Sequence, residues 1–124
     1  MYYFLNVNAI FKSHLLVKSF KMKNIFIHHV FFWLKNSGSE EAIQQLADGL
    51  TKLSAVQTIK KFHIGQPAAT SRSVVENTYD VSWCVEFDND ADQEAYQVDP
   101  VHLQFVTECS HLWSRVVVYD SVSI

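Results

Sequence analysis

The chain has 124 residues, of which 48% are hydrophobic and 19% are charged, and its net charge at neutral pH is −3. This length corresponds to one domain with a core of its own, and 14% aromatic residues with three glycines and two prolines argue against a disordered or collagen-like chain. A negative net charge disfavours a broad nucleic-acid-binding face, and no stretch approaches the roughly 18 apolar residues of a membrane span. We therefore expect neither nucleic acid nor a membrane as a partner.

The charge is unevenly distributed along the chain. Residues 1–21 contain three lysines and no acidic residue, whereas residues 22–124 carry seven Lys and Arg against thirteen Asp and Glu, a net charge of −6. The order of features differs from that of a secretory signal, because the uncharged residues precede the lysines. We expect residues 1–21 to be an extension outside a domain that spans residues 22–124. The alternative is a short amphipathic element that docks on the domain.

Residues 24–35 predict a strand, because they are dense in β-branched and aromatic side chains and contain neither Gly nor Pro. Alternation gives this strand two apolar faces. One face carries Phe26, His28, Val30, Phe32 and Leu34, and the other carries Ile25, Ile27, His29, Phe31 and Trp33. Residues 36–39 break the run, and Ser39 is the predicted N-cap of an amphipathic helix that ends near Ser54.

The second half of the chain alternates strand and helix signals. A second strand is predicted at residues 56–64, a loop at residues 68–77 and a third strand at residues 78–87. Helix starts follow in the acidic run after the third strand and at Asp99-Pro100, and a last strand covers residues 115–121. The order β-α-β-β-α-β predicts a ferredoxin-like α+β fold with one four-stranded antiparallel sheet and helices on one of its faces.

The predicted helices leave the other face of the sheet uncovered. The first strand nevertheless places Ile27, Phe31 and Trp33 on that face, and an exposed apolar patch of this kind marks an interface. A second copy packed sheet against sheet in a two-fold homodimer would cover it. His29 falls on the same face and is expected to be a dimer-face residue.

Three stretches of the sequence resemble one known family. They are HHVFFWLK (28–35), YQVDPVHLQF (96–105) and LWSRVVVYDS (112–121). In their order and spacing they resemble the stress-responsive A/B barrel family, also called the Dabb or dimeric α+β barrel domain, over about residues 22–121. The resemblance implies a homodimer whose two sheets form a barrel with the helices outside, and it implies no established reaction, since most members have none.

A plant member of that family cyclises a polyketide with a Tyr and a His of a segment Y-x-x-H-P-x-H. By resemblance, the Tyr of this segment is Tyr96 and its last His is His102, whereas Asp99 stands in place of its first His. Asp99 keeps the N-cap role and removes an imidazole, while the pair used by the cyclase is retained. The His of the family's first strand corresponds to His28.

The residues themselves leave several functions open. His28 and His102 both fall on apolar faces, and a buried imidazole needs a hydrogen-bond partner. They are either core residues bonded to each other, to Tyr96 or to water, or part of a pocket for a small apolar ligand that also involves Phe32 and Phe105. In a third hypothesis the protein is a cyclase or lyase in which His102 is the general base and Tyr96 polarises a carbonyl. A fourth hypothesis is a monooxygenase of the dimeric barrel type that handles haem or uses oxygen.

The sequence predicts neither a metal site nor a cofactor. His28 and His29 are adjacent in a strand and point to opposite faces, so they cannot chelate one ion. The acidic run that begins at Asp88 lacks the Gly and the bidentate Glu of an EF-hand loop, and no phosphate-binding glycine loop is present. Cys84 and Cys109 are isolated and are expected to be reduced thiols of a cytoplasmic protein, with a disulfide between them as the alternative.

Overall fold

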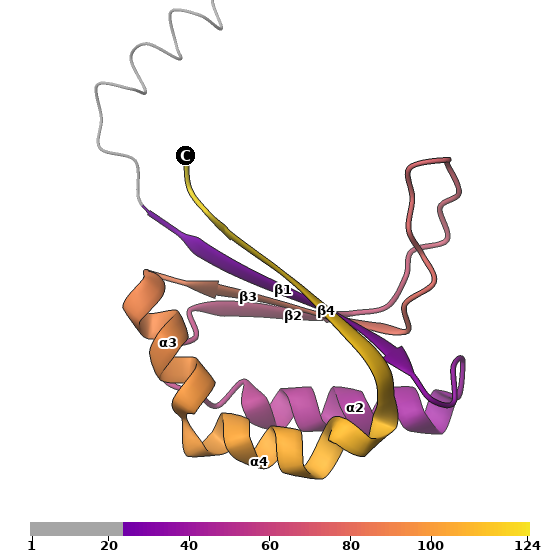
Figure 1. Cartoon of the computed structure of the whole chain (residues 1–124), viewed down its shortest axis with the longest axis horizontal. Helices are drawn as coiled ribbons and strands as arrows, with labels where there is room; N and C mark the ends of the chain where they lie inside the picture. The colour runs from indigo at the N-terminus through magenta and orange to yellow at the C-terminus, as the bar shows by residue number, and fades with distance from the viewer. Residues whose placement is uncertain (1–23) are drawn as a thin grey trace, which may run out of the picture.

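The computed structural model describes residues 24–124, so the expected extension, residues 1–21, lies outside the described residues (Figure 1). The elements in chain order are β1 (Phe26–Leu34), α2 (Glu40–Leu53), β2 (Lys61–Gly65), β3 (Val81–Phe87), α3 (Asp90–Val98), α4 (Pro100–Cys109), the 3-10 turn η1 (Ser110–Leu112) and β4 (Trp113–Val122). The strands form one antiparallel sheet in the order β2-β3-β1-β4. The predicted ferredoxin-like α+β arrangement is confirmed.

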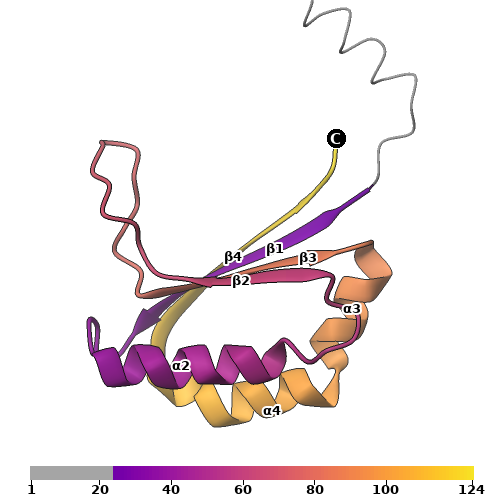
Figure 2. The same cartoon turned by 180° about the vertical axis from the view of Figure 1, so that it is seen from behind.

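The helices of the described part lie together on one side of the sheet (Figures 1 and 2). Helix α2 begins as predicted, with Ser39 as N-cap accepting a hydrogen bond from the Ala42 backbone N–H at 3.2 Å, and it ends at Leu53. Asp99 separates α3 from α4, and its carboxylate accepts from the Val101 backbone N–H at 2.8 Å. The Asp-Pro signal thus breaks the helical path once, so that α3 and α4 cover different parts of the sheet.

Two predicted strand boundaries are wrong. The strand predicted at residues 56–64 covers only residues 61–65, because Val56 lies in a turn after α2, where its N–H donates to the Leu53 carbonyl oxygen at 3.1 Å. Val56 is buried, so its apolar character serves the core from a turn. The strand predicted from residue 78 begins at Val81, because the buried Asp80 carboxylate accepts hydrogen bonds from the Leu34 and Gly38 backbone N–H groups.

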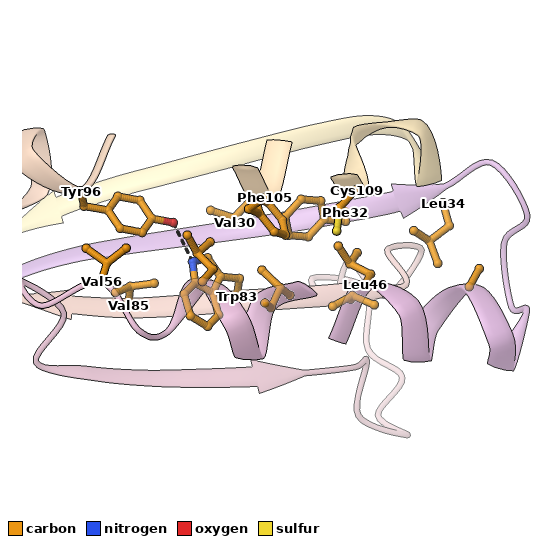
Figure 3. Packing of buried hydrophobic residues seen from close by; sticks show 14 of the residues in the cluster. Val30, Phe32, Leu34, Leu46, Val56, Trp83, Val85, Tyr96, Phe105 and Cys109 are labelled. Carbon is orange, nitrogen blue, oxygen red and sulfur yellow. Dashed lines mark hydrogen bonds between the residues drawn. The ribbon is translucent and has the colours of Figure 1, made fainter. Parts of the chain in front are cut away.

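The core lies between the sheet and the helices (Figure 3). It is formed by buried side chains from β1, α2, β3, α3 and α4, among them Phe32, Leu46, Leu50, Trp83, Val85, Tyr96 and Phe105. The Trp83 indole N–H donates to the Tyr96 hydroxyl oxygen at 3.0 Å, the dashed line in Figure 3. This bond satisfies the polar ends of two large buried aromatic residues.

The other side of the sheet, which we call the outer face, carries half-buried side chains. Phe31 contacts the Tyr79 ring, with centroids 4.9 Å apart, and the Arg115 guanidinium lies 4.5 Å from the centre of the Trp33 ring. His29 packs on Phe31 with centroids 4.2 Å apart. No helix of residues 24–124 covers this face in either view (Figures 1 and 2). Within the same residues, no helix has the length and apolar content to span a membrane.

Candidate functional site

A pocket of about 140 Å³ lies between the sheet and helices α3 and α4, and we call it the helix-side pocket. Each predicted site residue lines it. They are His28 and Phe32 from β1, Tyr96 from α3, and His102 and Phe105 from α4. The structure therefore brings together side chains that lie up to 77 positions apart in the chain. A larger hollow of about 470 Å³ lies beside the start of α3, but none of these imidazole or phenol groups lines it.

Local sequence signals explain how the polar groups reach the pocket. Alternation in β1 turns His28 towards the helices, next to the buried Val30. The Asp99 cap fixes the start of α4, and helical spacing from there puts His102 and Phe105 on the face towards the sheet. Tyr96 comes from the last turn of α3, so three separate elements supply the three polar rings.

His28 forms a hydrogen-bonded pair with Asp120 of β4. Its Nδ1 lies 2.6 Å from the Asp120 carboxylate oxygen, and the two residues are cross-strand partners in the β1–β4 register. The His28 side chain is 6% exposed and that of Asp120 is 43% exposed. Since the carboxylate engages Nδ1, Nε2 is the ring nitrogen that can serve a ligand.

Tyr96 lies between the two imidazoles. Its ring is edge-on to both, with centroids 5.6 Å from His28 and 4.8 Å from His102. Burial raises the pKa of the Tyr96 hydroxyl to about 12, against the smaller opposing effect of the hydrogen bond from Trp83. The phenol is therefore protonated at neutral pH, and because its oxygen accepts from Trp83, its own O–H can donate to a further group.

His102 contributes an unpartnered polar atom. Its Nδ1 is buried and has no hydrogen-bond partner among residues 24–124. Burial lowers the pKa of the imidazole, the nearby His28 lowers it further, and Asp99 opposes the shift. His102 is therefore a neutral imidazole at neutral pH, able to accept a proton or a hydrogen bond from a ligand.

The sequence leaves open whether both imidazoles are hydrogen-bonded core residues or line a ligand pocket. His28 is satisfied, but by Asp120, and within the described residues no hydrogen bond joins His28, Tyr96 and His102 to one another. Leaving a buried polar atom unpaired costs about 1–3 kcal/mol. A ligand with a donor group would remove that cost at His102.

Sequence reasoning missed Asp120 and the valines of β4. Val116 and Val118 share a face with Asp120, line the pocket and remain 42% and 45% exposed. The period-two signal in RVVVYD was available, but without the β1–β4 register it could not identify His28 as the partner of Asp120.

The remaining candidates lie away from the pocket. His29 is on the outer face as predicted, and its pKa is lowered by burial first and then by His63 and His28. Cys84 and Cys109 are free thiols, the first in register with His29 and the second buried in α4. No group of three or more metal-ligating side chains in residues 24–124 is arranged to hold a metal ion.

Comparisons with known proteins agree with this fold. The structure is similar to a Dabb family protein with a ferredoxin-like fold from Mesorhizobium loti, with a TM-score of 0.68, 20% sequence identity, and coverage of 82% of this chain and 98% of that one. It is similar to the hydroxynitrile lyase of Passiflora edulis, with a TM-score of 0.68, 20% identity, and coverage of 83% and 96%. A dimeric ferredoxin-like protein of unknown function from Thermobifida fusca matches with a TM-score of 0.65, 17% identity, and coverage of 84% and 95%.

The sequence itself matches one family. No protein with a curated description matches the chain. The family model of the stress-responsive A/B barrel domain matches residues 26–123, which contain every described strand and helix. The chain therefore belongs to the stress-responsive A/B barrel domain family, Dabb.

Proposed function

We propose that this protein is a homodimer and that each protomer binds one small, largely apolar ligand with a hydrogen-bonding group in the helix-side pocket. One observation carries the ligand proposal: His102, whose buried Nδ1 has no hydrogen-bond partner among residues 24–124, lines a pocket walled mainly by Val, Phe and Trp side chains. Ligand sites in proteins combine such apolar walls with a few placed polar groups.

The volume and the polar groups define the class of ligand. An apolar cavity of about 150 Å³ holds benzene, and the helix-side pocket has about 140 Å³. His102 Nδ1 can accept a hydrogen bond, and the Tyr96 hydroxyl can donate one. A ring or short chain that carries a carbonyl or hydroxyl group fits both requirements.

Binding of benzaldehyde tests this ligand class, with toluene as a probe of the same shape that lacks the carbonyl. We expect benzaldehyde to bind more tightly than toluene, because only benzaldehyde can accept the Tyr96 O–H, and Tyr96→Phe should abolish the difference. Benzyl alcohol, which can donate to Nδ1, should lose affinity in His102→Phe. Equal affinity for all three probes, or no binding of any, would contradict the proposal.

A second candidate function is that of a lyase or cyclase on a carbonyl-derived compound. It is favoured by the similarity to the hydroxynitrile lyase, together with two imidazoles and a protonated phenol around one pocket. In such a reaction His102 would take the hydroxyl proton of a cyanohydrin as the C–CN bond breaks. The cyanide leaves with its electron pair and is then protonated, and the carbonyl product can accept the Tyr96 O–H.

Release of benzaldehyde from mandelonitrile tests this reaction. Because the pKa of His102 is lowered, the rate should rise as the pH increases through the acidic range and level off before neutral pH. His102→Gln should remove the activity, while Glu41→Gln, an exposed position in the first turn of α2 that does not line the pocket, should retain it. A rate equal to that of the His102→Gln variant at every pH would exclude this function.

The homodimer proposal is supported by the outer face and by the dimeric proteins of the same fold. Val117 and Val118 are neighbours in β4 that point to opposite faces: Val117 is half-buried on the outer face, and Val118 lines the pocket. We expect Val117→Asp to yield monomers in light scattering and Val118→Asp to leave the dimer intact. A dimeric Val117→Asp protein would place the interface elsewhere.

A further inference from the structure

The connection between β2 and β3 is far longer than the strands require. It runs through residues 66–80, although Gly65 and Ser82, at the ends of the two strands, are paired neighbours. Strands paired in this way are usually joined by two to five residues. We call residues 66–80 the arm. Joining β2 to β3 does not by itself explain its length.

The arm stands on the side of the sheet opposite the helices. In Figures 1 and 2 it rises away from the sheet, while α2, α3 and α4 lie below it in both views. The outer face points in the same direction as the arm. A body that covers the outer face therefore has the arm beside it.

The base of the arm is continuous with the aromatic side chains of the outer face. The Trp33 indole N–H donates to the Thr78 hydroxyl at 2.9 Å, and the Tyr79 ring contacts the Phe31 ring. One residue further, the Asp80 N–H donates to the Phe32 carbonyl oxygen at 2.8 Å. The arm therefore leaves the sheet in a fixed direction.

The outer part of the arm has bonds of its own and an apolar tip. The Val75 N–H donates to the Arg72 carbonyl oxygen at 2.9 Å, and the Asn77 side-chain amide donates to the Thr70 carbonyl oxygen at 3.2 Å. Val74, between them, is 83% exposed. A single exposed valine is ordinary, but here it ends a bonded loop that projects on the uncovered side of the sheet.

We propose that the arm packs against the second copy of the chain in the homodimer, with Val74 buried on that copy. This proposal rests on the proposed outer-face dimer, and it adds an interface element that the sheet itself does not supply. Two-fold symmetry gives each protomer one arm that reaches its partner and one partner arm that it receives.

Trypsin reports on the arm directly, because Arg72 is the one Lys or Arg in residues 66–80. An exposed loop tip is a preferred site of cleavage, so the Val117→Asp monomer should be cut rapidly after Arg72. The wild-type dimer and the Val118→Asp dimer should be cut at least several-fold more slowly. Wild-type protein diluted until it dissociates provides a second monomer without any substitution. Equal cleavage after Arg72 in dimer and monomer would overturn the proposal.

Substitution of the tip provides an independent measurement. Val74→Ser should raise the dimer dissociation constant about tenfold, as expected for the loss of one buried valine side chain. Val98→Ser is the matched control, because Val98 is 72% exposed at the end of α3, on the helix side, and it should leave the constant unchanged. An unchanged constant in Val74→Ser would also overturn the proposal.

The two proposals can fail separately. If Val117→Asp remains a dimer, the outer-face interface is wrong and the arm proposal falls with it. If Val117→Asp is a monomer while Arg72 cleavage and the Val74→Ser constant match those of the wild-type dimer, only the arm proposal is wrong.

Discussion

The two sides of the sheet differ in how completely the chain covers them. On the helix side, Val85 and Trp83 are at most 1% exposed, and His28, Tyr96 and His102 line one pocket. On the outer face, His29, Phe31 and Trp33 are only half-buried although they belong to the same strand as the buried His28 and Phe32. β1 thus contributes to a fully buried core on one side and to a partly exposed apolar surface on the other. A second copy of the chain would cover that surface.

Adjacent histidines show the difference at the level of single groups. His28 is held by a carboxylate at 2.6 Å inside the pocket, whereas His29 lies on Phe31 on the outer face. Adjacent side chains in a strand point to opposite faces of the sheet, so the two imidazoles lie on different sides. The same type of side chain therefore contacts a carboxylate on one face and an aromatic ring on the other.

The largest expected effect comes from truncating the aromatic pair in the middle of β1. Phe32→Ala should lower the free energy of unfolding by about 3–5 kcal/mol, because it empties the core on the helix side. Phe31→Ala should mainly weaken dimerisation, so its effect on urea denaturation should depend on protein concentration, whereas that of Phe32→Ala should not. The same concentration dependence in both variants would contradict the division between the two faces.

A smaller effect is expected from pH. Burial lowers the pKa of His102 in the folded protein below its ordinary value of 6.5. Below pH 6.5 the unfolded chain therefore binds more protons at this site than the native protein does. The contribution of His102 is complete above pH 6.5 and is lost progressively as the pH falls below it. The urea midpoint should therefore decrease on acidification, and His102→Leu should reduce this decrease. If the urea midpoint of His102→Leu fell with pH as steeply as that of the wild type, His102 would not be the cause of the decrease.

His29 supplies the matching measurement on the outer face. Its pKa is lowered mainly by burial, and His63 and His28 add to the shift. Acidification should therefore also disfavour any state in which His29 is buried further, such as the proposed dimer. We expect the dimer dissociation constant to rise at acidic pH in wild type and less so in His29→Phe.

The smallest effect is expected at the rim of the pocket. Asp120→Asn should lower stability by about 1 kcal/mol or less, because the Asp120 side chain is 43% exposed and solvent weakens its interaction with His28. It should affect binding of a carbonyl ligand more than it affects folding, since it frees the His28 ring to turn. Parallel denaturation and benzaldehyde titrations of this variant separate the two effects.

The sequence predicts the parts of this fold whose signals are local. The dense strand of β1, the Ser39 cap and the Asp99-Pro100 break each act within a few residues, and each is confirmed. The strand prediction is wrong at Val56, because an apolar residue that is buried from a turn cannot be distinguished by its side chain from one in a strand. The boundary at Asp80 depends on partners that lie more than 40 positions away.

Local signals predict only part of the candidate site. Helical spacing and the family resemblance led to Tyr96 and His102, and alternation placed His28 on the same side. The Asp120 partner and the isolation of His102 Nδ1 depend on the strand register and on the packing of three elements. These features arise only when the chain folds.

Three consecutive valines of β4 test the division of tasks most directly. Val116 and Val118 line the helix-side pocket, and Val117 lies between them on the outer face. In methyl NMR spectra, benzaldehyde should shift the signals of Val116 and Val118 and leave Val117 in place, whereas dilution to the monomer should shift Val117 and leave the other two. A Val117 that responds to benzaldehyde, or a Val118 that responds to dilution, would contradict the assignment of ligand and partner to opposite faces.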